Sequence, residues 1–146
     1  MKTTVEQMLM QKGRDVWTIS PNATVMEALK LMAEKNVGAL VVTHDDEVVG
    51  IISERDYARK VVLRNKASIN TKVKEIMTEK VYYVGPKTTA EECMTLTVQQ
   101  NIRHLPVLKN GDLVGLVSIG DVVKAVIREQ ETEIGQLSDY ISGKYI

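Results

Sequence analysis

The stretch Val49–Asp56 reads VGIISERD, and the stretch Val114–Asp121 reads VGLVSIGD. The two lie 65 positions apart, and the gapless alignment that joins them covers residues 16–61 of the first copy. Over these 46 aligned positions 13 residues are identical, and most of the others keep their apolar or polar character. Self-similarity of this length predicts that the chain contains two copies of one structural unit.

Each copy is predicted to begin with a strand and a capped helix. A short apolar strand at 16–19, and its counterpart at 81–84, is followed within two residues by a proline. Next come Thr24-x-x-Glu27 in the first copy and Thr89-x-x-Glu92 in the second. Both are predicted capping boxes, in which the threonine accepts from a backbone N–H and the glutamate reaches back to the helix start.

An amphipathic helix, a hairpin and a last helix complete each unit. The apolar face of the first helix is predicted to carry Val25, Ala28, Leu29 and Met32, and its counterpart carries Ala90, Cys93, Met94 and Thr97. Apolar runs around a short turn, at 39–52 and at 105–117, then predict a β-hairpin in each copy. A last helix is predicted to begin at Ser53 and at Ser118, which gives the order β-α-β-β-α twice.

A fainter repeat precedes each unit, because Val5–Leu9 resembles Val73–Met77 at an offset of 68. The sequence therefore predicts one domain at 5–66 and a second at 67–128. A single unit of roughly 50 residues would be marginally stable alone, so the two are expected to share a core. Residues 129–146 form a polar tail with spaced apolar residues, predicted to be a short helix that packs on a neighbour; these residues are Ile134, Leu137 and Ile141.

Composition excludes several classes of protein. The 146 residues include 19 basic and 19 acidic side chains, which argues against a dedicated nucleic-acid binder. Cys93 is the only cysteine, so no disulfide can form within the chain, and a reducing compartment is expected. The N-terminus lacks the apolar core of a signal peptide, and no apolar run approaches the roughly 20 residues that span a bilayer. We therefore expect a cytoplasmic protein that binds neither nucleic acid nor membrane.

The repeated Ser53-x-x-Asp56 and Ser118-x-x-Asp121 allow two interpretations. Serine at the N-cap and aspartate three residues later form another capping box, which is a purely structural role. A carboxylate at a helix start also suits a ribose diol, and the neighbouring N–H groups and hydroxyl suit a phosphate. Gly50 precedes this motif, as Gly115 does in the second copy, and would either let backbone approach a ligand or mark a strand kink.

These motifs together resemble the CBS domain, named after cystathionine beta-synthase, and two in tandem resemble a Bateman module. The resemblance rests on Pro21–Ala28, Gly50–Asp56 and Gly115–Asp121, and it covers about residues 5–128. It implies an α/β (α+β) fold of two βαββα units with pseudo-twofold symmetry. It also implies two adenosine slots between the repeats, in which the aspartate holds the ribose hydroxyls and the serine lies near the phosphate.

By this resemblance each slot combines residues from both repeats. The first slot is expected to use Asp121, Ser118, Ile119 and His104 with Thr18 and Ile19. The second is expected to use Asp56, Ser53, Glu54 and Ala39 with Tyr83 and Val84.

The two predicted slots differ in charge. Arg103-His104 lies at the start of the second hairpin, where the first copy has Gly38-Ala39. Because arginine is well suited to phosphate, we expect the Asp121 slot to be the better nucleotide site. His104 could equally be a surface histidine in a turn. The cations after Ser53 are either a solvated helix face or a phosphate clamp; they are Arg55, Arg59, Lys60 and Arg64.

The sequence thus predicts a regulatory module that binds AMP, ADP, ATP or NAD(H), forms a homodimer and modulates a separate, unidentified protein. No catalytic residue, metal site or catalytic cofactor is expected. Catalysis by Cys93 is the first alternative, but its place on an apolar helix face favours a core role. A structural interaction module without a functional nucleotide site is the second alternative.

Overall fold

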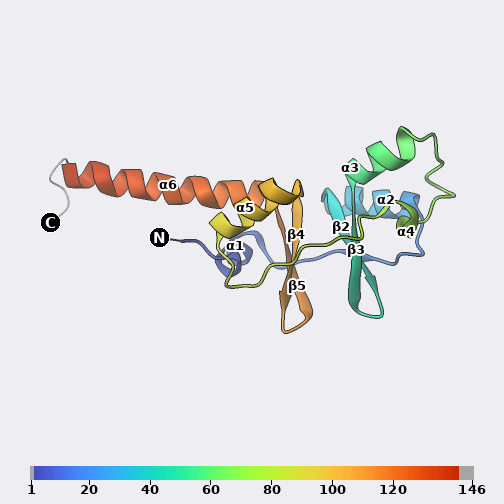
Figure 1. Cartoon of the computed structure of the whole chain (residues 1–146), viewed down its shortest axis with the longest axis horizontal. Helices are drawn as coiled ribbons and strands as arrows, with labels where there is room; N and C mark the ends of the chain where they lie inside the picture. The colour runs from blue at the N-terminus through green and yellow to red at the C-terminus, as the bar shows by residue number, and fades with distance from the viewer. Residues whose placement is uncertain (1, 142–146) are drawn as a thin grey trace. The chain divides into compact units, whose positions relative to one another are not determined.

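The computed structural model describes residues 2–141, with side chains described as far as residue 135. The chain divides into two compact units (Figure 1). The central unit is Asp15–Tyr82. The terminal unit combines the described residues up to Arg14 with those from Tyr83 onward.

The central unit is a three-stranded sheet with helices. Its sheet has the order β1-β2-β3, with β1 parallel to β2 and a β2–β3 hairpin, as the βαββ order of the sequence predicts. Its elements are β1 (Thr18–Ile19), α2 (Val25–Lys35), β2 (Ala39–His44), β3 (Glu47–Ser53), α3 (Glu54–Tyr57), the π-helix η1 (Ala58–Val62) and α4 (Val73–Ile76).

The terminal unit repeats this plan with one strand fewer. Its elements are α1 (Val5–Lys12), α5 (Ala90–Gln100), β4 (His104–Lys109), β5 (Asp112–Ser118) and α6 (Ile119–Ile141). The strand predicted at 81–84 is reduced to a bridge between Val84 and Val107. In the central unit Val41 donates its N–H to Trp17, but the aligned residue in β4 is Pro106, which has no N–H to donate.

The two helices that precede the repeats, α1 and α4 (the lead-in helices), each belong to the unit that contains the other repeat. Val5 of α1 donates its N–H to the carbonyl of Thr88 at 2.7 Å, inside the terminal unit. Val73 of α4 makes the equivalent bond to Ala23 at 2.8 Å, inside the central unit. The compact units therefore break after Arg14 and after Tyr82, whereas the predicted domains 5–66 and 67–128 followed chain order.

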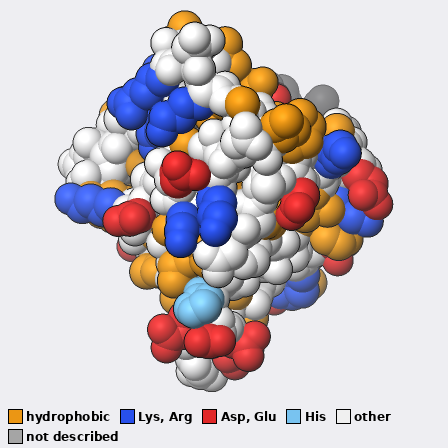
Figure 2. All heavy atoms as spheres, turned by 90° about the vertical axis from the view of Figure 1, so that its right-hand side faces the viewer, with side chains coloured by type: hydrophobic (Ala, Val, Ile, Leu, Met, Phe, Trp, Pro, Cys, Tyr) orange, Lys and Arg blue, Asp and Glu red, His pale blue; other side chains and the backbone are white. Residues whose placement is uncertain are grey.

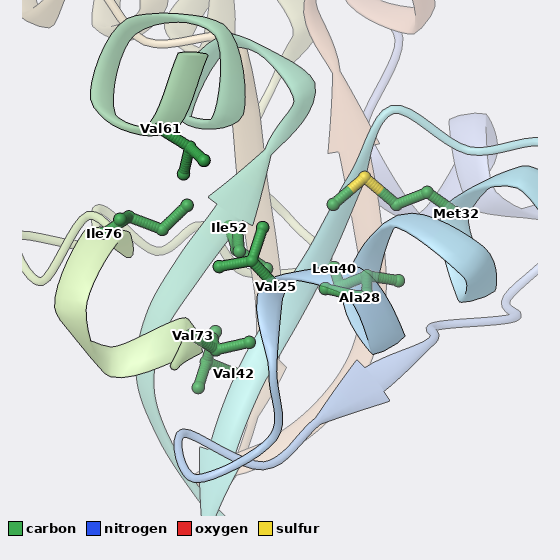
Figure 3. Packing of buried hydrophobic residues seen from close by; sticks show 9 residues of the cluster. All are labelled: Val25, Ala28, Met32, Leu40, Val42, Ile52, Val61, Val73 and Ile76. Carbon is green, nitrogen blue, oxygen red and sulfur yellow. The ribbon is translucent and has the colours of Figure 1, made fainter. Parts of the chain in front are cut away.

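Buried aliphatic side chains from every layer form the core of the central unit (Figure 3). The predicted face of α2 is confirmed, with Val25, Ala28 and Met32 buried and Leu29 partly buried at its edge. The remaining members come from the hairpin, η1 and α4; they are Leu40, Val42, Ile52, Val61, Val73 and Ile76. Short strands and short helices thus become stable by sharing one apolar cluster.

The predicted caps and turns are largely present. Thr89 and Glu92 form the complete capping box. At Thr24 only the threonine half is described, and the reciprocal bond predicted for Glu27 is absent from the described contacts, so that prediction was half wrong. The backbone of Thr24 instead lies in a β-bridge with Lys72, which brings α4 to this helix start.

The two last helices differ in length. In the central unit α3 gives way after Tyr57 to η1, whereas α6 runs unbroken from Ile119 to Ile141. The predicted tail helix is therefore the continuation of α6, and residues 142–146 of that prediction lie outside the described residues. Within the described part of the chain, no helix is both long and apolar enough to cross a membrane. Figure 2 shows acidic and basic side chains interspersed over one face.

Candidate ligand site at the helix starts

Both Ser-x-x-Asp motifs form capping boxes, so the structural interpretation is correct for each. Ser53 donates its N–H to Asp56 Oδ2 at 3.0 Å, and Asp56 returns an N–H to Ser53 Oγ at 3.2 Å. Ser118 and Asp121 make the same two bonds at 2.8 and 3.2 Å. The box fixes each carboxylate at the first turn of a helix and does not by itself exclude a ligand.

Asp56 is closed off by its own unit. Its Oδ2 is held by Ser53, while its Oδ1 accepts from Thr78 Oγ1 at 3.1 Å and lies 3.0 Å from Lys60 Nζ. The residue is only 8% exposed. Both carboxylate oxygens therefore have partners inside the central unit, which leaves little capacity to accept hydrogen bonds from a ribose.

Asp121 is held differently. Lys12 Nζ lies 2.6 Å from Asp121 Oδ2 and also donates to the carbonyl of Leu116 at 2.9 Å. The hydrogen bonds described for the Asp121 carboxylate all reach Oδ2, and none of them is directed to Oδ1. Burial alone would raise the pKa of this carboxyl, but the bonds from Lys12 and Ser118 outweigh it and the pKa is lowered. Asp121 is therefore an anion at neutral pH.

Lys12 is the site residue that the sequence reading missed. It ends α1, the helix that precedes the first repeat, yet its side chain reaches the helix start of the second repeat. The available signal was the faint repeat of Val5–Leu9, which shows that a lead-in helix accompanies each unit. Nothing in that signal showed which unit the helix would join.

Gly50 and Gly115 lie where the lead-in segments closely approach the strands. A Cβ at Gly115 would meet Leu9 Cδ1 at 2.7 Å, and a Cβ at Gly50 would meet Met77 Sδ at 2.8 Å. Leu9 and Met77 occupy equivalent places in the offset-68 repeat. The glycines are therefore required by the close approach of this neighbouring segment to the strand.

The terminal unit brings together most of the residues predicted for the first slot. His104 lies opposite Ser118 in the β4–β5 pair, and Ile119 donates its N–H to the carbonyl of Arg103 at 2.8 Å. Arg103 is exposed, His104 is partly buried, and Ile119 is 36% exposed. The backbone of Arg103, an exposed residue, is therefore bonded to the first residue of α6, two positions before the ionised Asp121.

The central unit brings together the corresponding residues with different chemistry. Ala39 lies opposite Ser53 and is 2% exposed. Glu54 donates its N–H to the carbonyl of Gly38, and a Cβ at Gly38 would meet Glu54 Oε1 at 3.3 Å. A carboxylate therefore lies beside the place where the terminal unit has Arg103, which disfavours a phosphate.

Four further predicted residues come from the position where a first strand was expected in each repeat. Thr18 and Ile19, which were predicted to complete the Asp121 slot, form β1 of the central unit. Tyr83 and Val84, which were predicted to complete the Asp56 slot, lie in the terminal unit, where Tyr83 is 45% exposed and Val84 is buried.

The predicted cation cluster after Ser53 does not form one face. The π-helix begins at Ala58, so Arg55 and Arg59 do not lie on one regular α-helix. Lys60 turns inward, donating to the carbonyl of Ile76 and pairing with Asp56. Arg55 is partly buried, while Arg59 and Arg64 are exposed.

Cys93 has the core position that was expected. Its side chain is completely buried, and burial together with neighbouring Glu92 raises the pKa of the thiol to about 11. A thiol in this state is a poor nucleophile. Among the described residues, no group of three or more histidine, cysteine, aspartate or glutamate side chains is arranged to hold a metal ion.

Comparison with known proteins places the chain in a family. The CBS domain model matches residues 5–63 and again 73–128. "CBS domain-containing protein CBSX3, mitochondrial" of Arabidopsis thaliana is 42% identical over 153 residues, which cover 98% of this chain and 74% of that protein. The chain belongs to the CBS domain family, and its two matches are a CBS pair.

Solved structures agree in fold. A putative signal-transduction protein with CBS domains from Burkholderia ambifaria MC40-6 is 53% identical, with a TM-score of 0.83, covering 88% of this chain and 96% of that one. A hexameric CBS-CP12 protein from bloom-forming cyanobacteria is 32% identical, with a TM-score of 0.76, covering 84% and 71%. These likenesses support the two-repeat α/β architecture.

Proposed function

We propose that this chain is a regulatory module that binds an adenine nucleotide (AMP, ADP, ATP or NAD(H)) at Asp121 and Ser118. The observation that carries the proposal is the unequal state of the two aspartates. Asp121 is ionised, its side chain is 20% exposed, and the hydrogen bonds described for its carboxylate all go to Oδ2. Asp56 is buried and both its oxygens are engaged.

The chemistry of the helix start suits this ligand. In this proposal Asp121 Oδ1 would accept hydrogen bonds from a ribose diol, while the first N–H groups of α6 and the exposed Arg103 would favour a phosphate. An incoming ribose hydroxyl would compete with Lys12 for the carboxylate. Binding would thereby loosen α1 from the start of α6, and a partner protein that binds the two states differently would sense the ligand.

Thermal unfolding with AMP, ADP, ATP and NAD(H) tests the binding step. A ligand at one hundred times its Kd stabilises the folded state by roughly 2.7 kcal/mol. Asp121→Ala should remove most of this shift, whereas Asp56→Ala should reduce it less, each compared with its own unliganded variant. Asp112→Ala is the matched control, because Asp112 is an exposed carboxylate of the same unit. Chromatography of the recovered nucleotides should show no turnover, and turnover would establish an enzyme instead.

A structural interaction module is the second candidate, and the capping boxes favour it. Because both boxes are complete, the Ser and Asp residues have a structural role even without a ligand. Absence of any thermal shift at millimolar AMP, ADP, ATP and NAD would support this candidate and contradict nucleotide binding.

We further propose that the chain functions as a homodimer. Exposed apolar side chains on the helices support self-association, among them Val98 and Ile134. The cyanobacterial CBS-CP12 relative is described as hexameric, so proteins of this fold do assemble. Light scattering of the full chain should give twice the monomer mass of 16.3 kDa.

A further inference from the structure

A stretch of one charge sign follows α3 in the central unit. Residues 58–74, called here the basic stretch, contain lysine and arginine but no aspartate or glutamate. Lys60 is turned inward to Asp56, whereas the other cations of the stretch are exposed; they are Arg59, Arg64, Lys66, Lys72 and Lys74. The balanced charge of the whole chain therefore conceals a strongly basic surface on one unit.

Exposed aliphatic side chains lie among these cations. Val62, Leu63 and Ile69 are 55%, 78% and 65% exposed, and no large apolar side chain in the described part of the chain is more exposed than Leu63. The preceding residue, Val61, is buried in the core. The core thus takes one side chain of the run Val61–Leu63 and leaves the next two in water, where a group of apolar side chains indicates an interaction surface.

The backbone of the basic stretch is anchored to its own unit. Lys66 donates its N–H to the carbonyl of Val61 at 2.9 Å, which closes the end of η1. Further along, the carbonyl of Ser68 accepts from the N–H of Met26 at 3.1 Å, in the first turn of α2. Figure 1 shows this connection in green, projecting at the edge of the central unit between α3 and α4. The exposed side chains are therefore displayed by ordered structure and not by a loose linker.

The second repeat does not carry the same chemistry. When the offset of 65 is continued past residue 61, Arg64 and Lys66 correspond to Glu129 and Glu131. The charge at these positions is thus reversed between the two copies. The basic stretch is a property of the first copy alone and not of the repeated fold, so it calls for a role of its own.

We propose that the basic stretch binds the surface of a membrane that contains anionic phospholipids. Val62, Leu63 and Ile69 enter the boundary between headgroups and acyl chains, while the flanking cations pair with the lipid phosphates. The sequence-based expectation of no membrane partner rested on the lack of a spanning segment and of a signal peptide, and binding at the surface requires neither. This role goes beyond the proposed nucleotide binding and does not depend on it.

Other anionic partners would use these groups less well. Single-stranded nucleic acids are bound largely by stacking on aromatic side chains, and residues 58–74 include no aromatic residue. A duplex would engage the cations through its phosphates but would leave Val62 and Leu63 in water. An acidic protein would need a packed, complementary interface of about 1,000 Å² or more, whereas a fluid bilayer adapts to a projecting connection.

Cosedimentation of the full chain with vesicles tests the binding. At about 0.1 M salt the chain should sediment with vesicles of phosphatidylcholine and phosphatidylglycerol in equal parts, but not with phosphatidylcholine alone. Arg64→Gln and Lys66→Gln should each lower the partition coefficient about fivefold, the effect of one cation near an anionic surface. Lys87→Gln, at an exposed lysine of the terminal unit, is the matched control and should leave it unchanged. Failure to sediment with the anionic vesicles, or an equal loss in Lys87→Gln, would overturn the proposal.

Fluorescence tests the entry of the apolar side chains. Leu63→Cys labelled with an environment-sensitive dye should shift its emission to the blue when the anionic vesicles are added, because the dye leaves water. Val98→Cys, at a residue of α5 that is 68% exposed, is the matched control and should not shift. Cys93 is buried, so the dye reacts at the introduced thiol. An unshifted spectrum of the bound Leu63→Cys protein would overturn the proposed insertion.

Two further measurements separate this surface from other ligands. Duplex DNA that binds more tightly than the vesicles, with the same loss in Arg64→Gln, would assign the basic stretch to nucleic acid and overturn the proposal. The nucleotide site fails separately: Asp121→Ala should keep its vesicle binding, and Lys66→Gln should keep its thermal shift with adenine nucleotides. Loss of nucleotide binding with intact vesicle binding would contradict the proposed ligand and leave the membrane surface standing.

Discussion

Lys12 Nζ and Asp121 Oδ2 lie 2.6 Å apart although 109 positions separate the two residues in the chain. The pair joins the end of α1 to the first turn of α6. It is partly exposed, with 36% of the Lys12 side chain and 20% of the Asp121 side chain accessible to water. Its contribution to stability is therefore that of a partly screened ion pair.

Lys12→Met should lower the free energy of unfolding at pH 7 by no more than about 1 kcal/mol. The pair lowers the pKa of Asp121, so its contribution is present above the ordinary carboxyl pKa of 3.8 and is lost as the pH falls through the lowered folded value. Urea unfolding at pH 7 and at pH 3 measures the difference. Lys87→Met, an exposed lysine of the same unit, should show neither the loss nor its pH dependence. A Lys12 effect that persisted undiminished well below pH 3 would contradict the assignment to charge.

Alanine at either strand glycine should destabilise the fold by about 1–3 kcal/mol through overpacking. We expect the larger loss for Gly50→Ala, because its new Cβ would lie 2.9 Å from the backbone oxygen of Thr78, which cannot turn aside. At Gly115 the nearest atoms belong to the Leu9 side chain. Thermal unfolding of both variants makes the comparison.

Gly120→Ala serves as the control for these two variants, since its nearest neighbour would be Ser118 Oγ at 3.6 Å. It should match or exceed the stability of the unsubstituted chain, because alanine favours the first turn of α6. Equal tolerance of alanine at Gly50, Gly115 and Gly120 would show that the lead-in segments adjust freely to the strands.

The sequence repeat predicted the order of elements because strand and helix periods, caps and turn residues are local signals. The Asn110-Gly111 turn is an example, with positive φ at both residues. Asp45 and Asp46 also have positive φ, although neither is a glycine. The turn of the first copy therefore has the same backbone with a weaker signal in its sequence. The predictions made from local sequence patterns were therefore largely correct.

The tertiary packing of these elements could not be predicted from local sequence patterns. The docking of α1 on the terminal unit depends on contacts across the chain, such as Leu9 on Gly115, that have no local signature. The loss of the 81–84 strand, by contrast, could have been anticipated from Pro106, whose ring removes the required donor. At the candidate site, the Ser-x-x-Asp pairs were found from sequence, while Lys12 and Thr78 were supplied by the lead-in segments.

The thiol of Cys93 should react slowly with a disulfide reagent at pH 8 in the folded protein. Its side chain is fully buried, and burial with the nearby Glu92 raises its pKa to about 11, so little thiolate is present. Colour release should become fast and complete once denaturant unfolds the chain. Rapid reaction of the native protein would contradict the core assignment and would reopen a catalytic role for this residue.

Gly135→Ala should strengthen the outer part of α6. Glycine in a helix interior costs roughly 0.5–1 kcal/mol relative to alanine, and a Cβ at this position would meet nothing within 4 Å. Amide hydrogen exchange of residues near 131–139 should slow by up to about fivefold, because local opening governs exchange there. The melting temperature of the whole chain should change less, since this segment lies beyond the part of α6 whose residues Val122 and Ala125 are buried in the terminal unit.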